Sequence, residues 1–146
     1  MKKGIISSIL LASIFVAGSA LSANPQAVVG KYLTQDKDSI VQVFKCGAKF
    51  CGRIVWLKTP NDKAGKPKVD SNNPNAKYKT RKIHGMNLVG GFSHAGGNIC
   101  ENGNIYNPKD GKTYSCKMTL NGNKLSVRGY VGIAALGKTV VWTKTG

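Results

Sequence analysis

Apolar side chains stand at every second position along much of this chain, and this alternation limits the folds that it can adopt. In residues 112–120 the apolar members of the alternation are Tyr114, Cys116, Met118 and Leu120. Polar residues stand between them, which is typical of a strand that buries one face. The same reasoning predicts strands over residues 28–34, 39–46, 50–57, 124–130 and 138–144, and a short strand near 88–92. No segment after residue 23 carries the apolar stripe of a helix, so the chain is predicted to be all-β.

Tight turns separate these predicted strands. Residues 36–38 and 121–123 have the length of hairpin turns, and residues 107–111 (Asn-Pro-Lys-Asp-Gly) are the strongest turn signal in the chain. Strands joined in this way form a meander. A meander of this size buries one face most simply by curling into a closed barrel, which removes the open sheet edges. We therefore predict a small antiparallel meander β-barrel.

The beginning of the chain predicts export. A short basic start precedes an uncharged, mostly apolar run over residues 5–17, and small residues lead to Ala23, which is the pattern of a secretory signal peptide over residues 1–23. The run is shorter than the ~20 residues that cross a bilayer, so a retained membrane anchor is the weaker interpretation. We predict cleavage after Ala23, with Ala20 as the alternative. A single domain over residues 24–146 then remains, in the periplasm or outside the cell.

The chain is strongly basic, with 22 Lys and Arg against 6 Asp and Glu and a net charge of +16. Such a charge ordinarily suggests a nucleic-acid partner, but export separates the chain from nucleic acid. Much of the charge gathers in residues 58–82, where three prolines oppose regular structure, so we predict a long basic loop there. This loop could bind an anionic envelope polymer, lipid headgroups or an acidic protein, or it could simply face solvent. The candidate docking residues are Lys63, Lys66, Lys68, Lys77 and Lys79.

Four cysteines lie in the predicted exported domain, and an even number in an oxidising compartment predicts two disulfides. They allow three pairings. Cys46 and Cys51 flank a four-residue stretch of hairpin length, which favours a bond between them on neighbouring strands. Cys100 and Cys116 remain, and the midpoint between them falls on the turn at residues 107–111. A zinc site is the competing interpretation, but the spacings match no common set of zinc ligands, so no metal is predicted.

Several stretches of the chain combine into a recognisable pattern. They are residues 39–47 (SIVQVFKCG), 51–57 (CGRIVWL), 65–70 (GKPKVD), 72–74 (NNP), 103–108 (GNIYNP), 110–115 (DGKTYS), 127–133 (VRGYVGI) and 142–143 (WT). In this order they resemble a bacterial exported family, domain-of-unknown-function family 2147. The resemblance covers the chain from about residue 29 to residue 144. It implies a lipocalin-like fold, in which a small barrel encloses a cavity, and a ligand-carrying role without catalytic residues.

The resemblance also bears on single residues. Residues 30–32 (Gly-Lys-Tyr) are similar to the opening motif of lipocalins with Tyr in place of Trp, which implies that Tyr32 closes the barrel bottom and that Lys144 packs on its ring. Many family members carry a Trp and a small residue where this chain has Cys100 and Cys116. That paired difference supports the second disulfide.

Six side chains on predicted strands are candidate ligand contacts. Arg53 and Arg128 would need an anionic partner if they pointed into the barrel, and an outward, solvated position is the alternative. The aromatic candidates could line a cavity or belong to the core. They are Trp56, Tyr114, Tyr130 and Trp142.

Catalysis is not predicted, because the six carboxylates fall in or beside predicted turns and no nucleophile elbow is present. No cofactor is predicted either. The predicted function is an exported, lipocalin-like binding protein for a small ligand that is at least partly apolar, with an anionic group as one option. The alternative is a surface-interaction protein that uses the loop over residues 58–82 on an anionic partner.

Overall fold

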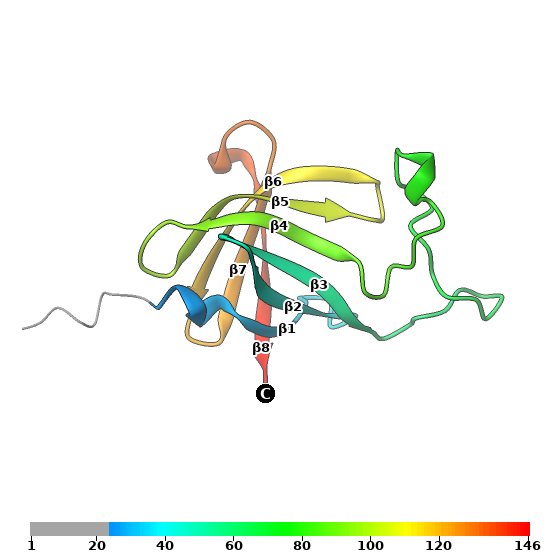
Figure 1. The fold of residues 1–146 in the computed structure, drawn as a ribbon, viewed down its shortest axis with the longest axis horizontal. Helices are drawn as coiled ribbons and strands as arrows, with labels where there is room; N and C mark the ends of the chain where they lie inside the picture. The colour runs from blue at the N-terminus through cyan, green and yellow to red at the C-terminus, as the bar shows by residue number, and fades with distance from the viewer. Residues whose placement is uncertain (1–23) are drawn as a thin grey trace, which may run out of the picture.

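Eight antiparallel strands pair in sequence order and close into a barrel (Figure 1). The structure is a computed structural model that describes residues 24–146, so the predicted signal peptide, residues 1–23, lies outside the described residues. β1 pairs with β2 on one side and with β8 on the other, which completes the barrel. The strands are β1 (Gly30–Leu33), β2 (Ser39–Cys46), β3 (Lys49–Leu57), β4 (Asn87–His94), β5 (Ile99–Asn107), β6 (Lys112–Asn121), β7 (Lys124–Tyr130) and β8 (Lys138–Thr145).

The barrel confirms the predicted all-β meander, but the alternation pattern did not predict β5. The pairing of β5 with β6 shifts between Cys100 and Gly103, and both of these residues are buried. Asn102, between them, has a φ of 62°. Such a bulge places an extra residue in the strand and breaks the period of two, so the segment lacks the pattern that identifies a strand.

The barrel has two unlike ends. The turns β1–β2, β3–β4, β5–β6 and β7–β8 lie at one end, which we call the mouth end. The other turns and the short 3-10 helix η2 (Pro25–Val28) lie at the opposite, closed end. The side chains buried near the closed end are large, and they fill the barrel there. They include Val43, Phe50, Phe92, Met118 and Leu125.

Tyr32 and Lys144 close the bottom of the barrel, as the lipocalin-like opening motif implied. Tyr32 is fully buried, and its hydroxyl donates a hydrogen bond of 2.7 Å to the carbonyl of Val28. The ammonium of Lys144 lies 5.9 Å from the centroid of the Tyr32 ring and donates to the carbonyl of Ala27 at 3.1 Å. Burial raises the pKa of Tyr32 to about 12, so the phenol stays neutral at physiological pH.

The predicted disulfide between Cys46 and Cys51 is confirmed. The two residues lie on either side of the β2–β3 turn at the closed end, with their Cα atoms 5.9 Å apart. The bond therefore ties together two strands that the turn already holds close.

The predicted disulfide between Cys100 and Cys116 is wrong, since both are buried free thiols. The register of the β5–β6 hairpin explains the error. Residues 108–111 form the predicted turn, but the pairing that leads from it puts Cys116 opposite Gly103. The bulge in β5 then puts Cys100 opposite Met118, so the two thiols are diagonal neighbours and not a facing pair.

Residues 58–86, which we call the β3–β4 connection, include residues 58–82, for which the sequence predicts a long basic loop. They are folded onto themselves by two isolated bridges, Asn61 with Pro67 and Val69 with Lys82. The short 3-10 helix η3 (Ala76–Tyr78) lies within the segment that the second bridge closes. Figure 1 shows the connection extending beyond the mouth end of the barrel.

Asp70 fixes this connection to the barrel. Its side chain is fully buried and accepts hydrogen bonds from the Tyr106 hydroxyl on β5 at 2.6 Å, from the Asn73 amide at 2.8 Å and from the Arg81 guanidinium at 2.8 Å. Burial opposes ionisation of Asp70, but these bonds outweigh it and hold the pKa of the carboxyl below its usual range. Burial, followed by the bond to Asp70, raises the pKa of Tyr106 to about 12.

A second contact joins the β3–β4 connection to the β5–β6 turn. The Asn72 amide donates to the carbonyls of Pro108 and Lys109, both at 3.1 Å. Gly111, with a φ of +70°, packs so tightly here that an added Cβ would lie 1.9 Å from the Asn72 carbonyl oxygen. The turn and the connection therefore fit each other only because residue 111 is a glycine.

The free thiols give the first testable prediction. Unfolding in denaturant without reductant should expose two groups to iodoacetamide, Cys100 and Cys116, whereas the native protein should react slowly because both thiols are buried and burial raises the pKa of Cys116 to about 12. Mass spectrometry of the alkylated protein counts the groups, with a reduced sample that should gain four as the control. Absence of any modification in the unfolded, unreduced sample would mean that a second disulfide exists.

The Asp70 contacts give the second prediction. Asp70→Asn should lower the free energy of unfolding by about 2–3 kcal/mol, because it removes a buried acceptor from a partly exposed Arg81. The contribution of Asp70 should be present above pH ~4 and be lost as pH falls through its lowered pKa, and that acid dependence should weaken in the variant. Denaturant titrations at several pH values measure both effects.

The matched control is Asp62→Asn, the same change at an exposed carboxylate of the β3–β4 connection. It should alter stability by no more than about 0.5 kcal/mol. Hydrogen exchange adds a local readout, because the Asp70 amide bonds to the Arg81 carbonyl and the Ile83 amide to the Lys68 carbonyl. Full protection of these amides in Asp70→Asn would contradict the role given to Asp70.

Candidate functional site

A cavity of about 1010 Å³ occupies the mouth half of the barrel. Strands β3 to β8 contribute to its walls. The β1–β2 turn, the β3–β4 connection and the β5–β6 turn contribute to its rim. These connections all lie at the mouth end, so the cavity opens there, opposite the end that Tyr32 closes.

The walls of the cavity are apolar because inward-facing positions of the strands carry aliphatic or aromatic side chains. They include Ile54, Leu88, Ile105, Val127, Val140 and Trp142. Gly129 also lines the cavity, and an added Cβ there would meet Ile105 and Tyr114 only at ordinary contact distances of 3.5 and 3.7 Å. A Cβ would therefore fit at residue 129 without a clash, and the missing side chain helps to keep the mouth half hollow.

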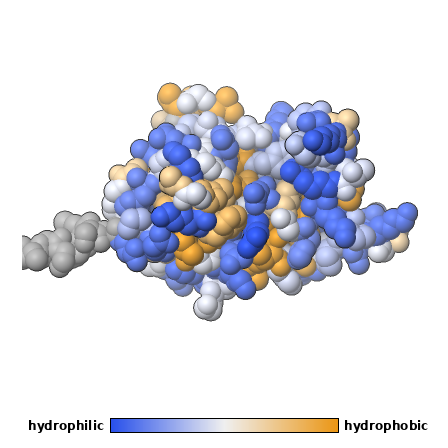
Figure 2. All heavy atoms as spheres, in the orientation of Figure 1, coloured by the Kyte–Doolittle hydropathy of each residue, from blue (hydrophilic) through white to orange (hydrophobic). Residues whose placement is uncertain are grey.

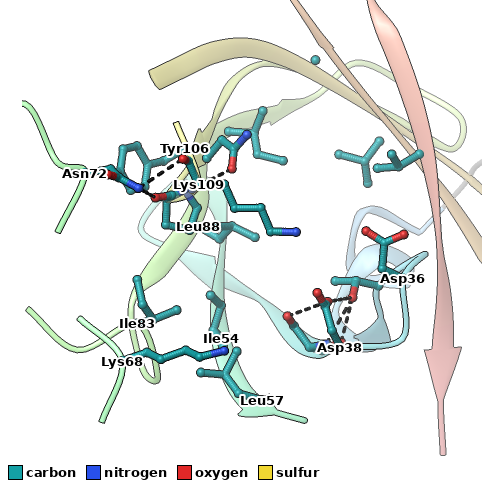
Figure 3. Close-up of a pocket in the computed structure, with 18 of the residues that line it drawn as sticks. Asp36, Asp38, Ile54, Leu57, Lys68, Asn72, Ile83, Leu88, Tyr106 and Lys109 are labelled. Atoms are coloured by element: carbon teal, nitrogen blue, oxygen red, sulfur yellow. Dashed lines mark hydrogen bonds between the residues drawn. The ribbon is translucent and has the colours of Figure 1, made fainter. Parts of the chain in front are cut away.

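Charged side chains of both signs surround the rim. They are Asp36, Asp38, Asp62, Lys68, Lys109 and Lys138. Figure 3 shows Lys68 and Lys109 reaching toward the cavity from one side, with Asp36 and Asp38 on the other. An apolar chamber with a charged rim suits a molecule that has an apolar body and a charged end.

Two of the rim carboxylates already have protein donors. Asp38 accepts the hydroxyls of Thr34 and Ser39, each at 3.0 Å. Burial acts to raise the pKa of Asp38, but these hydroxyl bonds and the charge of Lys109 outweigh it and lower the pKa. Asp62 accepts two backbone amides of its own turn, at 2.9 and 3.0 Å.

The rim lysines differ from these carboxylates. Within residues 24–146, the ammonium groups of Lys68, Lys109 and Lys138 make no hydrogen bond to a protein acceptor, and the ion pair there joins Arg81 to Asp70 instead. Ammonium groups that face a cavity without an acceptor are suited to an anion.

Two of the six predicted ligand contacts line this cavity. Trp142 is buried in its wall, and Tyr114 lies near the rim. The Tyr114 hydroxyl donates to Asp110 at 2.6 Å, and this bond raises the pKa of the tyrosine. Both residues occupy the inward face that the alternation of β6 and β8 gives them.

The other four predicted contacts do not line this cavity and lie on the outer face of the barrel. Arg53 alternates with the buried Gly52 and Ile54, and its guanidinium lies 4.9 Å from the centroid of the Phe44 ring. Trp56 is 42% exposed. The pairing of β2 with β3 shifts between Ile54 and Trp56, so alternation continued from Ile54 does not give the face on which Trp56 lies.

Arg128 and Tyr130 share the outward face of β7. Arg128 stands between Val127 and Gly129, which both line the cavity. Its guanidinium donates to the Thr139 hydroxyl at 2.6 Å and to the Ala135 carbonyl at 3.2 Å. Arg128 therefore points away from the cavity, which was the alternative prediction, and its guanidinium is hydrogen-bonded within the protein.

The five predicted docking lysines are dispersed. Lys68 lines the cavity rim. Lys79 donates to the Ser71 carbonyl at 3.3 Å, and Lys77 lies 5.7 Å from the centroid of the Tyr78 ring. Lys63 and Lys66 are exposed. Docking of this loop on an anionic surface stays a prediction.

Sequence reasoning did not identify Lys109, Lys138 or the glycine at position 129 as cavity residues. Lys138 has the same parity on β8 as Val140 and Trp142, so its place was open to prediction from the alternation alone. Lys109 lies in a turn, and its approach to the cavity depends on the contact between that turn and Asn72. No pattern within the sequence encodes that contact.

Within residues 24–146 no group of three or more His, Cys, Asp or Glu side chains could hold a metal ion. In the same range no helix is both long enough and apolar enough to cross a bilayer.

Comparison with known proteins gives one structural and one family relationship. The chain is similar to the solved structure described as protein HP1028 from the human pathogen Helicobacter pylori, which belongs to the lipocalin family. The TM-score is 0.72 and the sequence identity 29%, with 81% of this chain and 82% of that chain covered. No curated protein matches the chain.

The family relationship spans the whole barrel. Residues 30–144 match the family described as uncharacterized protein conserved in bacteria (DUF2147). The match begins with β1 and ends within β8. The resemblance seen in the sequence motifs is thereby confirmed, and the chain belongs to the DUF2147 family of bacterial proteins.

Proposed function

We propose that the protein is an exported, lipocalin-like carrier of a small amphiphile, with the apolar body of the ligand in the barrel and its anionic headgroup at the rim. The observation that supports this most directly is the cavity of about 1010 Å³ with apolar walls and three rim lysines. In this proposal the signal peptide over residues 1–23 directs export, and the domain over residues 24–146 acts in the periplasm or outside the cell.

The walls support an apolar ligand body. Ile54, Val127 and Trp142 contribute to a chamber that is large enough for a drug-sized or lipid-sized molecule, since ligand pockets commonly measure ~300–1,000 Å³. Transfer of apolar surface into such a chamber contributes about 25 cal/mol per Å². This gain requires no covalent step, so binding without catalysis accounts for the arrangement.

The rim favours a negative headgroup over a positive one. The carboxylates of Asp38 and Asp62 are held by hydroxyl and amide donors, whereas Lys68, Lys109 and Lys138 face the cavity. A carboxylate or phosphate at the rim would give these lysines an acceptor. The net charge of the chain acts in the same direction at long range.

Filling the cavity tests the proposal. Gly129→Leu should abolish or strongly weaken uptake of an apolar fluorescent probe, because residue 129 lines the cavity, a Cβ fits there without a clash, and the rest of the leucine would take up cavity volume. The matched control is Gly90→Leu, since residue 90 stands in β4 near Cys51 on the outer face, where an added Cβ would lie 3.7 Å from the sulfur. Probe titration measures the affinity, and circular dichroism checks the fold.

The outcome that would contradict the cavity proposal is equal probe binding by Gly129→Leu and Gly90→Leu. A second measurement uses the natural source. Native mass spectrometry and lipid extraction of the purified protein should reveal a co-purifying amphiphile. A protein that neither carries such a molecule nor binds apolar probes is not a carrier.

Neutralising the rim tests the headgroup. Lys68→Gln, Lys109→Gln and Lys138→Gln combined should weaken binding of dodecanoate by about tenfold or more, since each lost charge–carboxylate contact contributes roughly 0.5–1 kcal/mol at a solvated rim. Binding of dodecanol should change little. The control with the same change of charge is Lys31→Gln, Lys45→Gln and Lys117→Gln, which lie away from the cavity. Equal losses for dodecanoate and dodecanol would rule out a headgroup role for these lysines.

A further inference from the structure

The β7–β8 connection carries an exposed apolar surface that the cavity does not explain. Residues 131–137, which we call the apolar tip, contain no charged residue. Val131 is 75% exposed, Ile133 62% and Leu136 79%. Figure 2 shows apolar side chains gathered at the top of the molecule, where Figure 1 places this connection. Three large apolar side chains that protrude from one short segment usually mark an interaction surface.

The apolar tip has a defined conformation. It contains the short 3-10 helix η4 (Ala134–Leu136), and the Leu136 amide donates to the Ile133 carbonyl at 3.2 Å. Arg128 on β7 reaches up and donates to the Ala135 carbonyl at 3.2 Å. The protein therefore holds these apolar side chains outward, where they face solvent.

The position of the apolar tip relates it to the cavity. It joins β7 to β8 at the mouth end, directly before Lys138, which lines the rim. Lys109 and Lys68 lie on the same rim, and the basic β3–β4 connection extends from the same end. The mouth end thus combines a protruding apolar segment, next to Lys138 in the sequence, with further lysines on the rim and in the β3–β4 connection.

This combination favours one kind of partner. An apolar segment flanked by cations is suited to the interface of an anionic lipid bilayer, where apolar side chains enter the acyl boundary and cations meet the headgroups. A second copy of this chain is disfavoured, because two strongly basic molecules, each with a sequence charge of +16, would repel each other at this end. An acidic protein would satisfy the charge, but it is not needed to cover a segment as small as residues 131–137.

We propose that the apolar tip inserts into the surface of an anionic bilayer and places the cavity mouth against the membrane. The docking itself does not depend on the proposed carrier function. If that function holds, docking lets an amphiphile pass between bilayer and cavity without crossing water.

Vesicle binding tests this proposal without any cavity ligand. The purified protein should co-sediment with phosphatidylcholine vesicles that contain phosphatidylglycerol, and much less with pure phosphatidylcholine. The double variant Ile133→Ser/Leu136→Ser should bind the anionic vesicles at least about tenfold more weakly, because it removes two side chains from the lipid interface. Its uptake of the apolar probe in the absence of vesicles should equal that of the unmodified protein, which separates a failure of docking from a failure of carriage.

The matched control removes two exposed apolar side chains from the outer wall of the barrel. Trp56→Ser/Val141→Ser changes residues that are 42% and 37% exposed, and it should bind vesicles as the unmodified protein does. As a direct readout, Ile133→Trp should show blue-shifted, enhanced fluorescence from the new indole when anionic vesicles are added. The same titration of the unmodified protein measures the fluorescence of Trp56 and Trp142, which is then subtracted.

Three outcomes would overturn the proposal. The first is equal vesicle binding by Ile133→Ser/Leu136→Ser and the unmodified protein. The second is no binding by the unmodified protein, or equal binding to neutral and anionic vesicles. The third is loss of binding in a variant with glutamine at the exposed lysines of the β3–β4 connection while the tip variant binds normally, which would assign docking to that connection. The lysines in question are Lys63, Lys66, Lys77 and Lys79.

Discussion

Closure of the sheet between β1 and β8 is the constraint on which the rest of the structure depends. β1 has four residues and pairs on both sides. Once the sheet is closed, each strand has one inward face, and the size of its side chains decides whether the barrel is filled or hollow. Phe50 and Phe92 fill the closed half, whereas Val127 and Gly129 leave the mouth half empty. One backbone architecture thus provides a core and a cavity.

The charged residues fall into two groups, according to whether their charged atoms form hydrogen bonds within the protein. The Asp70 carboxylate is buried and fully engaged, and it positions the β3–β4 connection as part of the cavity rim. Arg128 is engaged outside the barrel, where it supports the β7–β8 connection. The rim lysines, by contrast, face the cavity without a protein acceptor among the described residues. Part of the excess positive charge of the chain is therefore located at the mouth end.

The sequence predicted the architecture better than it predicted the site, because β-bulges change which side chains face the cavity. Alternation identified most strands, and Tyr114 and Trp142 followed their patterns into the cavity. Register shifts in the β2–β3 and β5–β6 pairs are not visible in the sequence. They account for the outward Trp56 and for the two cysteines that do not face each other. Lys109 reaches the cavity only through a contact between distant segments, which local patterns do not encode.

The separate fates of the four cysteines have a consequence for how the chain matures. Cys46 and Cys51 are separated by five positions, so closing that small ring costs little chain entropy and does not require the complete barrel. The folded core encloses Cys100 and Cys116, so their thiols are shielded from oxidants only once the barrel has closed. A variant that slows barrel closure should therefore leave these two thiols exposed to oxidation or mispairing for longer, even where the folded barrel is equally stable.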